Sequence, residues 1–293
     1  MKVFSNNFIM NRSLRIFLAT LLVALIIRPA AASDFATDVM NATFKFYDPD
    51  STATCFLVRR EPPDTANYLI TAAHVIEDVK GRTAVLVLRT PKADGSFARR
   101  DYTITIRTNG RALWVRHKTE DVAVLRLTAP LPVPVAALPE SVLADEARFQ
   151  QSGVHICSPL FVLTYPARLE ANDAAFPIAR RGIFASAPLL PMPVTPSLLP
   201  KSTKSSRPVT FLADFTTFAG DSGGPVFIES ADGSPLIVGI VLGRTFQDLK
   251  HQDEYGEALV HYPLGLGTIL HAQCVRDTLD AAAKPVAAAP KSK

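Results

Sequence analysis

Short apolar runs rich in Val, Ile, Phe and Thr recur along most of the chain, mostly separated by Pro, Asp, Asn or Gly, and this pattern predicts many short β-strands. In residues 102–107, YTITIR, apolar side chains occupy every second position, which is the period of a half-buried strand. Further strands are predicted at residues 42–47, 54–59, 67–73, 83–89, 121–127, 161–165, 209–213, 225–228, 236–242 and 258–262. So many short strands, with little helical pattern, favour an all-β fold built as an antiparallel barrel or sandwich.

Three stretches depart from the strand pattern. Residues 131–150 have some helical character and are predicted to connect an N-terminal sheet unit to a C-terminal one. Residues 186–208 are rich in Pro and Ser, so we expect a long extended loop, either a plain insertion or a substrate-binding or regulatory loop. Residues 268–282 place apolar side chains close to a helical stripe, which predicts a terminal helix packed on the barrel, followed by a disordered tail at 284–293.

The first 32 residues have the pattern of a secretory signal peptide. Three basic residues precede an apolar run at 16–27, and Ala30 and Ala32 form a small-residue cleavage site. The apolar run is shorter than the roughly 20 residues that span a bilayer, which favours cleavage over an anchor that stays in the membrane. We therefore expect a secreted or periplasmic protein of bacterial type, with residues 33–283 as its folded domain.

Charge does not indicate a nucleic-acid or membrane partner. The whole chain has 31 basic and 27 acidic residues and a pI near 9.0. The predicted signal peptide carries four of the basic residues and no acidic one, which leaves 27 basic against 27 acidic residues. The basic pI therefore comes largely from the targeting segment, and the remaining chain is close to neutral.

The three cysteines, Cys55, Cys157 and Cys274, are too few for a disulfide framework. Export makes one bridge feasible, with one thiol left over and all three pairings open. No Cys-x-x-Cys or His-x-x-x-His spacing occurs, so we expect no metal and no other cofactor.

Residues 218–228, FAGDSGGPVFI, place Ser222 in a glycine-rich turn that leads into an apolar strand. Such turns are also common as plain hairpin ends, so Ser222 needs a general base and a third group before it can be a nucleophile. His74 ends a strongly apolar strand among small residues, in NYLITAAHV. Asp121 stands directly before the apolar run VAVLRL, where a carboxylate needs a partner, and His74 is the natural one.

These motifs in this order, TAAH at 71–74, DVAVL at 121–125 and GDSGGP at 220–225, resemble the trypsin-like (chymotrypsin-fold) serine proteases. The resemblance covers roughly residues 40–280. It implies two six-stranded antiparallel β-barrels, the first at about 40–130 and the second at about 150–265.

The resemblance also implies roles for individual residues. Ser222 is the expected nucleophile, His74 the general base and then acid, and Asp121 the residue that orients His74. The backbone amides of Gly220 and Ser222 are expected to form the oxyanion hole. The implied substrate is a protein or peptide.

Other positions depart from the family pattern. No Ile-Val-Gly-Gly motif precedes His74, so Asp221 lacks the freed amino terminus that it pairs with in the digestive members, and it needs another partner or stays solvated. Val75 stands where a cysteine is common, so Cys55 lacks its usual mate. By spacing, Thr216 lies at the base of the specificity pocket, which argues against a preference for Arg or Lys.

The remaining pocket residues implied by the resemblance are Leu242, Gly243 and Arg244. Arg244 either narrows the pocket, favours an acidic substrate side chain, or is a solvated surface residue. The sequence thus predicts an exported serine endopeptidase. The alternative is a catalytically silent binding or regulatory module on the same fold.

Overall fold

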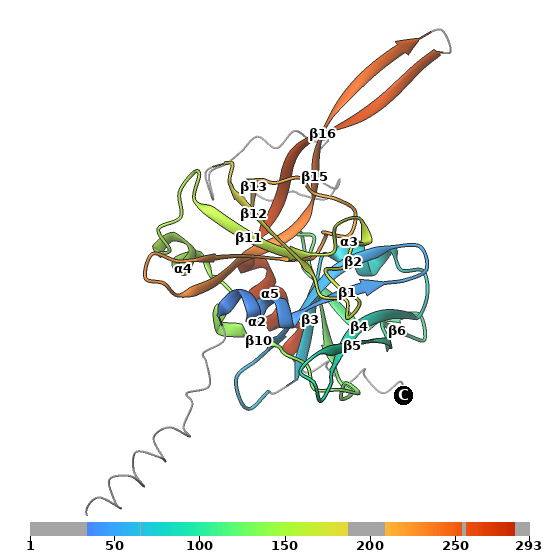
Figure 1. The fold of residues 1–293 in the computed structure, drawn as a ribbon, viewed down its shortest axis with the longest axis vertical. Helices are drawn as coiled ribbons and strands as arrows, with labels where there is room; N and C mark the ends of the chain where they lie inside the picture. Colours follow the sequence, from blue (N-terminus) through green and yellow to red (C-terminus); the bar gives the residue numbers. More distant parts are fainter. Residues whose placement is uncertain (1–33, 65, 187–208, 254–255, 285–293) are drawn as a thin grey trace, which may run out of the picture. The chain divides into compact units, whose positions relative to one another are not determined.

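The computed structural model describes residues 34–64, 66–186, 209–253 and 256–284 (Figure 1). The predicted signal peptide, nearly all of the Pro/Ser-rich segment and most of the predicted tail lie outside these residues. Among the described helices, none combines the length and the hydrophobicity needed to cross a membrane.

The first half of the fold is a β-sheet of eight strands, in the order β5-β4-β1-β2-β3-β9-β8, with β10 pairing parallel to β2. Its strands are β1 (Thr43–Tyr47), β2 (Thr52–Arg59), β3 (Asn67–Thr71), β4 (Thr83–Pro91), β5 (Phe97–Thr105), β8 (Trp114–Arg116), β9 (Ala123–Leu127) and β10 (Leu138–Pro139). A separate pair joins β6 (Arg107–Thr108) to β7 (Arg111–Ala112). Two short helices belong to this half, α2 (Phe35–Ala42) and α3 (Ala73–Asp78).

The second half is a closed barrel of six antiparallel strands. In barrel order they are β11 (Pro159–Thr164), β12 (Ile178–Phe184), β13 (Thr210–Asp214), β16 (Gly256–His271), β15 (Pro235–Asp253) and β14 (Pro225–Glu229). The connector between the halves holds η1 (Glu140–Val142) and α4 (Glu146–Gln151), and η2 (Pro166–Arg168) follows β11.

The predicted all-β fold is confirmed, with two refinements. The second barrel has the six expected strands, but the first half has eight, because short strands such as β10 have too few residues to show a periodicity. The terminal helix is α5 (Ala272–Ala283), which begins later than predicted because residues 268–271 form the end of β16, where Leu270 pairs with β13 and His271 with β15.

A buried cluster joins the two halves and α5. It contains Ile70 and Val124 from the first sheet, Ile240 and Leu270 from the barrel, and Leu279 from α5. Burying a side chain of this kind stabilises a fold by roughly 1.5–3 kcal/mol. Because this cluster contains side chains from both halves, it holds loops of one half against loops of the other.

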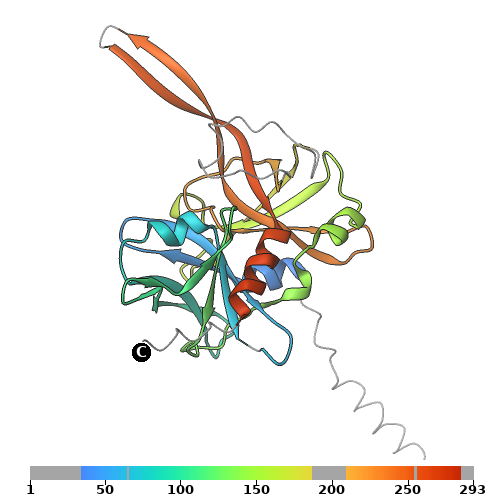
Figure 2. The ribbon, with the colours of Figure 1, turned by 180° about the vertical axis from the view of Figure 1, so that it is seen from behind.

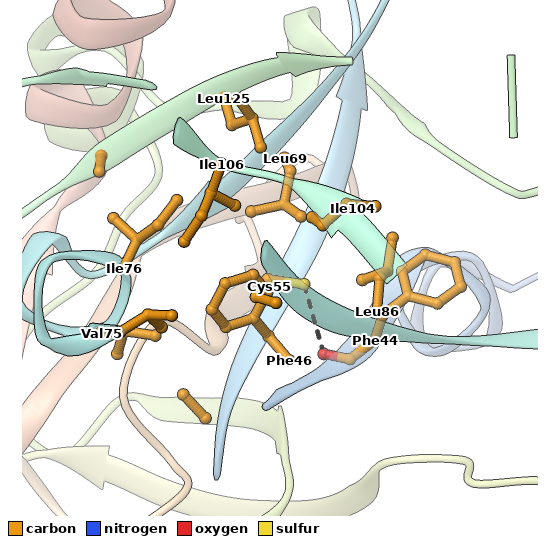
Figure 3. Packing of buried hydrophobic residues seen from close by; sticks show 14 of the residues in the cluster. Phe44, Phe46, Cys55, Leu69, Val75, Ile76, Leu86, Ile104, Ile106 and Leu125 are labelled. Carbon is orange, nitrogen blue, oxygen red and sulfur yellow. Dashed lines mark hydrogen bonds between the residues drawn. The ribbon is translucent and has the colours of Figure 1, made fainter. Parts of the chain in front are cut away.

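A second cluster fills the inside of the first sheet (Figure 3). Phe44, Phe46 and Leu86 pack there around Cys55, whose thiol donates a hydrogen bond to the carbonyl oxygen of Phe44 at 3.5 Å. Burial of the Cys55 thiol raises its pKa well above the ordinary value. The thiol is therefore an apolar core group rather than a nucleophile.

All three cysteines are free, so the disulfide that the sequence left feasible does not form. Cys55 is buried in the cluster inside the first sheet, Cys274 is buried in the cluster that joins the halves, and Cys157 is exposed. Burial raises the pKa of Cys274 to about 12, which keeps this thiol protonated.

Strands β15 and β16 continue past the barrel as a long two-stranded hairpin (Figures 1 and 2). Their pairing extends to Asp253 opposite Gly256. The sequence predicts only residues 236–242 and 258–262 as strands here. The intervening residues carry many charged and polar side chains, and such side chains are found on a hairpin whose two faces are both solvated.

Candidate active site

His74 and Asp121 lie at the same edge of the first sheet because β3 and β9 are antiparallel neighbours. The last residue of β3, Thr71, is opposite the first residue of β9, Ala123. His74 follows β3 at the start of α3, and Asp121 directly precedes β9. The register of these two strands therefore brings together side chains that are 47 residues apart.

Both carboxylate oxygens of Asp121 contact His74. Nδ1 of the ring lies 2.6 Å from Oδ2, and the backbone amide donates to Oδ1 at 2.9 Å. The amide contact fixes the carboxylate, and the carboxylate in turn fixes the ring with Nδ1 as the protonated nitrogen. The side chain of Asp121 is 10% exposed and that of His74 is 40% exposed, so the other ring nitrogen, Nε2, can be reached by a ligand.

The pair shifts both pKa values in favour of the charged forms. Burial lowers the pKa of His74, but the hydrogen bond and the charge of Asp121 outweigh it, and the pKa is raised overall. Burial likewise raises the pKa of Asp121, but the hydrogen bond and the charge of His74 outweigh it, and this pKa is lowered. The site thus holds an ionised carboxylate beside a histidine whose charged form it stabilises.

The turn with Ser222 is held between the two halves. On one side the amide of Thr54 in β2 donates to the carbonyl oxygen of Ser222 at 3.0 Å. On the other side the amide of Gly223 donates to the carbonyl oxygen of Val241 in β15 at 2.8 Å. A methyl group placed on Gly223 would lie 2.9 Å from the amide nitrogen of Ala72, so the turn packs directly against the residues that precede His74.

The hydroxyl of Ser222 donates to the carbonyl oxygen of Leu242 at 3.0 Å. In this arrangement it does not donate to His74. A serine hydroxyl reaches a different partner by rotation about one bond, and such contacts are often long or unformed without substrate.

The surroundings of position 220 leave room only for glycine. Its φ is +102°, and a methyl group there would lie 2.1 Å from the carbonyl oxygen of Tyr165. Its own carbonyl oxygen accepts from the Thr54 hydroxyl at 2.7 Å. Among the described residues, no acceptor takes the amide hydrogen of Gly220 or of Ser222.

A strained turn sets the direction of the Gly220 amide. Ala167 and Arg168 have φ of +50° and +69°, and the amide of Ala167 donates to the carbonyl oxygen of Ala219 at 2.7 Å. In a trans peptide the N–H points opposite to the C=O, so the amide of Gly220 faces away from Ala167. Lys45 in β1 holds this turn, because its ammonium donates to the carbonyl oxygen of Arg168 at 3.1 Å.

Asp221 has a partner that the sequence did not identify. Its side chain is 1% exposed, and Oδ1 lies 2.6 Å from the guanidinium of Arg180 in β12. This oxygen has no hydrogen bond, so the contact is an ion pair, whereas Oδ2 accepts from the amide of Phe218 at 2.7 Å. Arg180 also donates to the carbonyl oxygen of Thr216 at 2.6 Å and to the hydroxyl of Thr164 at 2.8 Å.

Two residues of this site, Arg180 and Thr54, were missed by sequence reasoning. Arg180 stands beside Arg181 in an arginine pair, and nothing in the sequence separates the partly buried arginine from the exposed one. Thr54 is fully buried, and its only signal in the sequence is a threonine directly before the apolar run 55–58. Its hydroxyl also accepts from the amide of Tyr165 at 3.1 Å, so one side chain ties β2 to two loops of the barrel.

The structure separates the four predicted pocket residues into two groups. Leu242 is half-buried and accepts the Ser222 hydroxyl, and Gly243 follows it with open space where a side chain would project. Arg244 is exposed, and its guanidinium lies 4.9 Å from the ring centre of Phe246. Thr216 is exposed and is linked to the turn through Arg180.

Among the residues that the structure describes, no three His, Cys, Asp or Glu side chains are grouped closely enough to hold a metal ion. The groups that the structure brings together at this site are the hydroxyl of Ser222, the imidazole of His74, the carboxylate of Asp121 and backbone amides. These are the groups used in acyl transfer.

A family model described as the trypsin-like peptidase domain matches residues 53–240, which is more than half of the chain. None of the curated proteins matches the chain. Two solved structures of Rv3671c are similar to it. The inactive form of a serine-to-alanine mutant, from M. tuberculosis H37Rv, is 20% identical, with a TM-score of 0.50, over 90% of this chain and 95% of that one. An inactive form of the Rv3671c protease is 17% identical, with a TM-score of 0.50, over 86% and 93% of the two chains. At these identities the likeness shows a shared fold.

Proposed function

The chain belongs to the trypsin-like peptidase family and is thus a serine endopeptidase, and we propose that it cleaves peptide bonds through an acyl-enzyme on Ser222. The observation that carries this proposal is the contact of His74 with both oxygens of Asp121, beside the turn that presents Ser222. The family membership also favours an enzyme over the catalytically silent binding module.

In the proposed reaction, rotation about one bond moves the Ser222 hydroxyl from the carbonyl oxygen of Leu242 to Nε2 of His74. As Oγ attacks the substrate carbonyl carbon, His74 takes its proton, and Asp121 stabilises the imidazolium. His74 then gives this proton to the leaving amine as the C–N bond breaks. Water reverses the sequence and releases the acid product, with His74 again as the base.

The negative oxygen that forms during attack is proposed to bind the amides of Gly220 and Ser222. Two observations support this role: neither amide has an acceptor among the described residues, and Ala167 holds the peptide before Gly220 in one orientation. Donors fixed in advance stabilise the developing charge without having to reorganise during the reaction. We assign Lys45 a positioning role, because it holds the turn that contains Ala167.

We propose that the nucleophile turn is held by an internal cation. Arg180 is paired with Asp221 inside the folded domain, so this turn does not depend on an amino terminus freed by cleavage. We further propose that Thr216, Leu242, Gly243 and Arg244 border the substrate side chain next to the scissile bond. These residues include no acid, which argues against a preference for Arg or Lys.

We also propose export, on the strength of the basic, apolar and small-residue pattern of residues 1–32. Sequencing of the mature amino terminus tests this proposal. A terminus that still begins within the first 30 residues contradicts cleavage at the predicted site.

The acyl-enzyme is tested by labelling folded protein with a fluorophosphonate, which reacts with activated serines. We expect label on the wild type, none on Ser222→Ala, and strongly slowed labelling of His74→Ala. Ser230→Ala, which changes a serine that is half-buried like Ser222 but lies on another turn, is the matched control and should label normally. A folded wild type that takes no label contradicts the proposed nucleophile.

A further inference from the structure

The part of the β15/β16 hairpin that lies outside the barrel is called the arm here, and comprises residues 246–253 and 256–263. Phe246 pairs with Pro263 at its base, and Leu249 pairs with Val260 farther out. The arm extends away from the barrel in both views of the ribbon (Figures 1 and 2). Within the described part of the chain, no strand other than β15 and β16 pairs with it.

One edge of β15 runs from the nucleophile to the end of the arm. β16 covers the opposite edge as far as Asp253, whereas β14 covers the first edge only as far as Ile240. Val241 then bonds to the nucleophile turn, and the carbonyl oxygen of Leu242 accepts the hydroxyl of Ser222. From Gly243 outward no described strand pairs with this edge, and it continues for about 30 Å at about 3.3 Å per residue.

The arm also presents apolar side chains to water. Leu249, Val260 and Tyr262 are 42%, 45% and 57% exposed. Because Leu249 is opposite Val260 and Tyr262 is two residues farther along β16, all three lie on one face of the hairpin. The other face also carries an exposed leucine, Leu259, but beside it lies a polar pair in which Nδ1 of His261 is 2.6 Å from Oδ1 of Asp248.

An unpaired strand edge beside an apolar face is the combination that binds an extended peptide by adding a strand. We infer that the arm is a docking surface for the polypeptide substrate itself, for the segment that precedes the scissile bond. This inference rests on the proposed function of Ser222. The continuity of one strand edge with the Ser222 turn is the reason to assign the substrate, rather than an unrelated protein, as the occupant.

The direction of the bound segment follows from the direction of β15. This strand passes Ser222 at Leu242 and then runs outward. Antiparallel pairing is more stable than parallel pairing. A substrate paired antiparallel to β15 runs from the end of the arm towards the barrel, so its carboxyl-side end lies at Ser222. The residues before the scissile bond therefore lie along the arm, and apolar side chains at alternate positions contact Leu249, Val260 and Tyr262.

The test compares peptides that extend by about four to about ten residues before the scissile bond, with leucine or serine at alternate positions. We expect kcat/KM to rise about tenfold with length for the leucine series, because about three cross-strand contacts are added. Peptides lengthened after the scissile bond serve as the control and should gain little.

The variant combines Leu249→Thr, Val260→Thr and Tyr262→Thr, which keeps residues that favour strands. It should lose the gain with length and keep the rate on short peptides. Leu113→Thr changes a similarly exposed leucine of the first half, 45% exposed, and should behave as the wild type. A second variant that replaces residues 247–262 with a two-residue turn should give the same result.

Binding of the same peptides to Ser222→Ala separates the arm from the catalytic proposal. If short peptides are cleaved but long ones bind no more tightly, the docking surface is wrong and the proposed function stands. If long peptides bind more tightly but no peptide is cleaved, the proposed catalysis is wrong and the docking surface stands. Arm variants that change only the oligomeric state also overturn the proposal, because the occupant is then a second copy of the chain.

Discussion

Replacing Arg180 with methionine should destabilise the protein and inactivate it, because it leaves the Asp221 carboxylate buried without its cation. The carboxylate is 1% exposed, and the amide of Phe218 is the hydrogen-bond donor that remains to it. Removing one partner of a buried ion pair costs about 3–5 kcal/mol. The substitution also removes the two hydrogen bonds that Arg180 donates to Thr216 and Thr164, while the methionine chain still fills much of the space.

This loss of free energy can destabilise the whole fold, or it can displace only the turn that contains Ser222. In the first case, the midpoint of urea unfolding moves by an amount equivalent to about 3–5 kcal/mol. In the second case, the turn leaves the arrangement seen in the structure, and kcat/KM falls by a factor of about 10² to 4 × 10³, since each 1.4 kcal/mol corresponds to a factor of ten. The urea midpoint and kcat/KM are therefore measured on the same preparation, so that a loss of free energy appears in one quantity or the other.

Two further variants make the measurement specific. Arg181→Met changes the exposed neighbour and should alter neither quantity by more than about 0.5 kcal/mol. Combining Arg180→Met with Asp221→Asn removes the charge that was left unpaired, so it should recover part of the stability. If Arg180→Met unfolds at the wild-type urea concentration and keeps its full kcat/KM, the assignment of Arg180 as the support of Asp221 is refuted.

Three other predictions concern single groups. Gly220→Ala should lower kcat by about 10² to 10³ in steady-state assays, because a methyl group 2.1 Å from the Tyr165 carbonyl displaces the proposed oxyanion donor; unchanged kcat contradicts that role. Asp121 raises the pKa of His74 above its ordinary value of 6.5, so kcat/KM should rise with pH through an apparent pKa above 6.5. Asp121→Asn should lower kcat/KM by roughly 10⁴ and lower the apparent pKa of this pH dependence. If the apparent pKa does not change, another acid acts on His74. Burial lowers the pKa of His271 to about 4 in the folded protein. In the unfolded chain this histidine takes up its proton at a higher pH, near 6.5, so the free energy of unfolding decreases as the pH falls from about 6.5 towards 4. Urea unfolding should show a loss of about 2–3 kcal/mol between about pH 7 and pH 4.5 from this group, absent in His271→Asn; equal losses in both proteins contradict it.

The sequence determined the fold class and the grouping of Ser222, His74 and Asp121 as a hypothesis, because each signal is local. Strand periodicity is visible within six residues, and a glycine-rich turn or an acid before a core strand is visible within ten. The order of the three motifs in the sequence then carried the family resemblance, which implied a role for each residue. The same local signals did not predict the length of β15, whose outer part has no apolar alternation to mark it as a strand.

Only the tertiary structure decided which polar groups meet. Arg180 and Arg181 are equivalent in the sequence, yet the pleat of β12 turns one towards Asp221 and the other to solvent. Thr54 reaches Gly220 across 166 residues, a contact that no periodicity encodes. Periodicity tells which face a side chain occupies, whereas its partner depends on strand register and on how the two halves pack, and these exist only once the chain has folded.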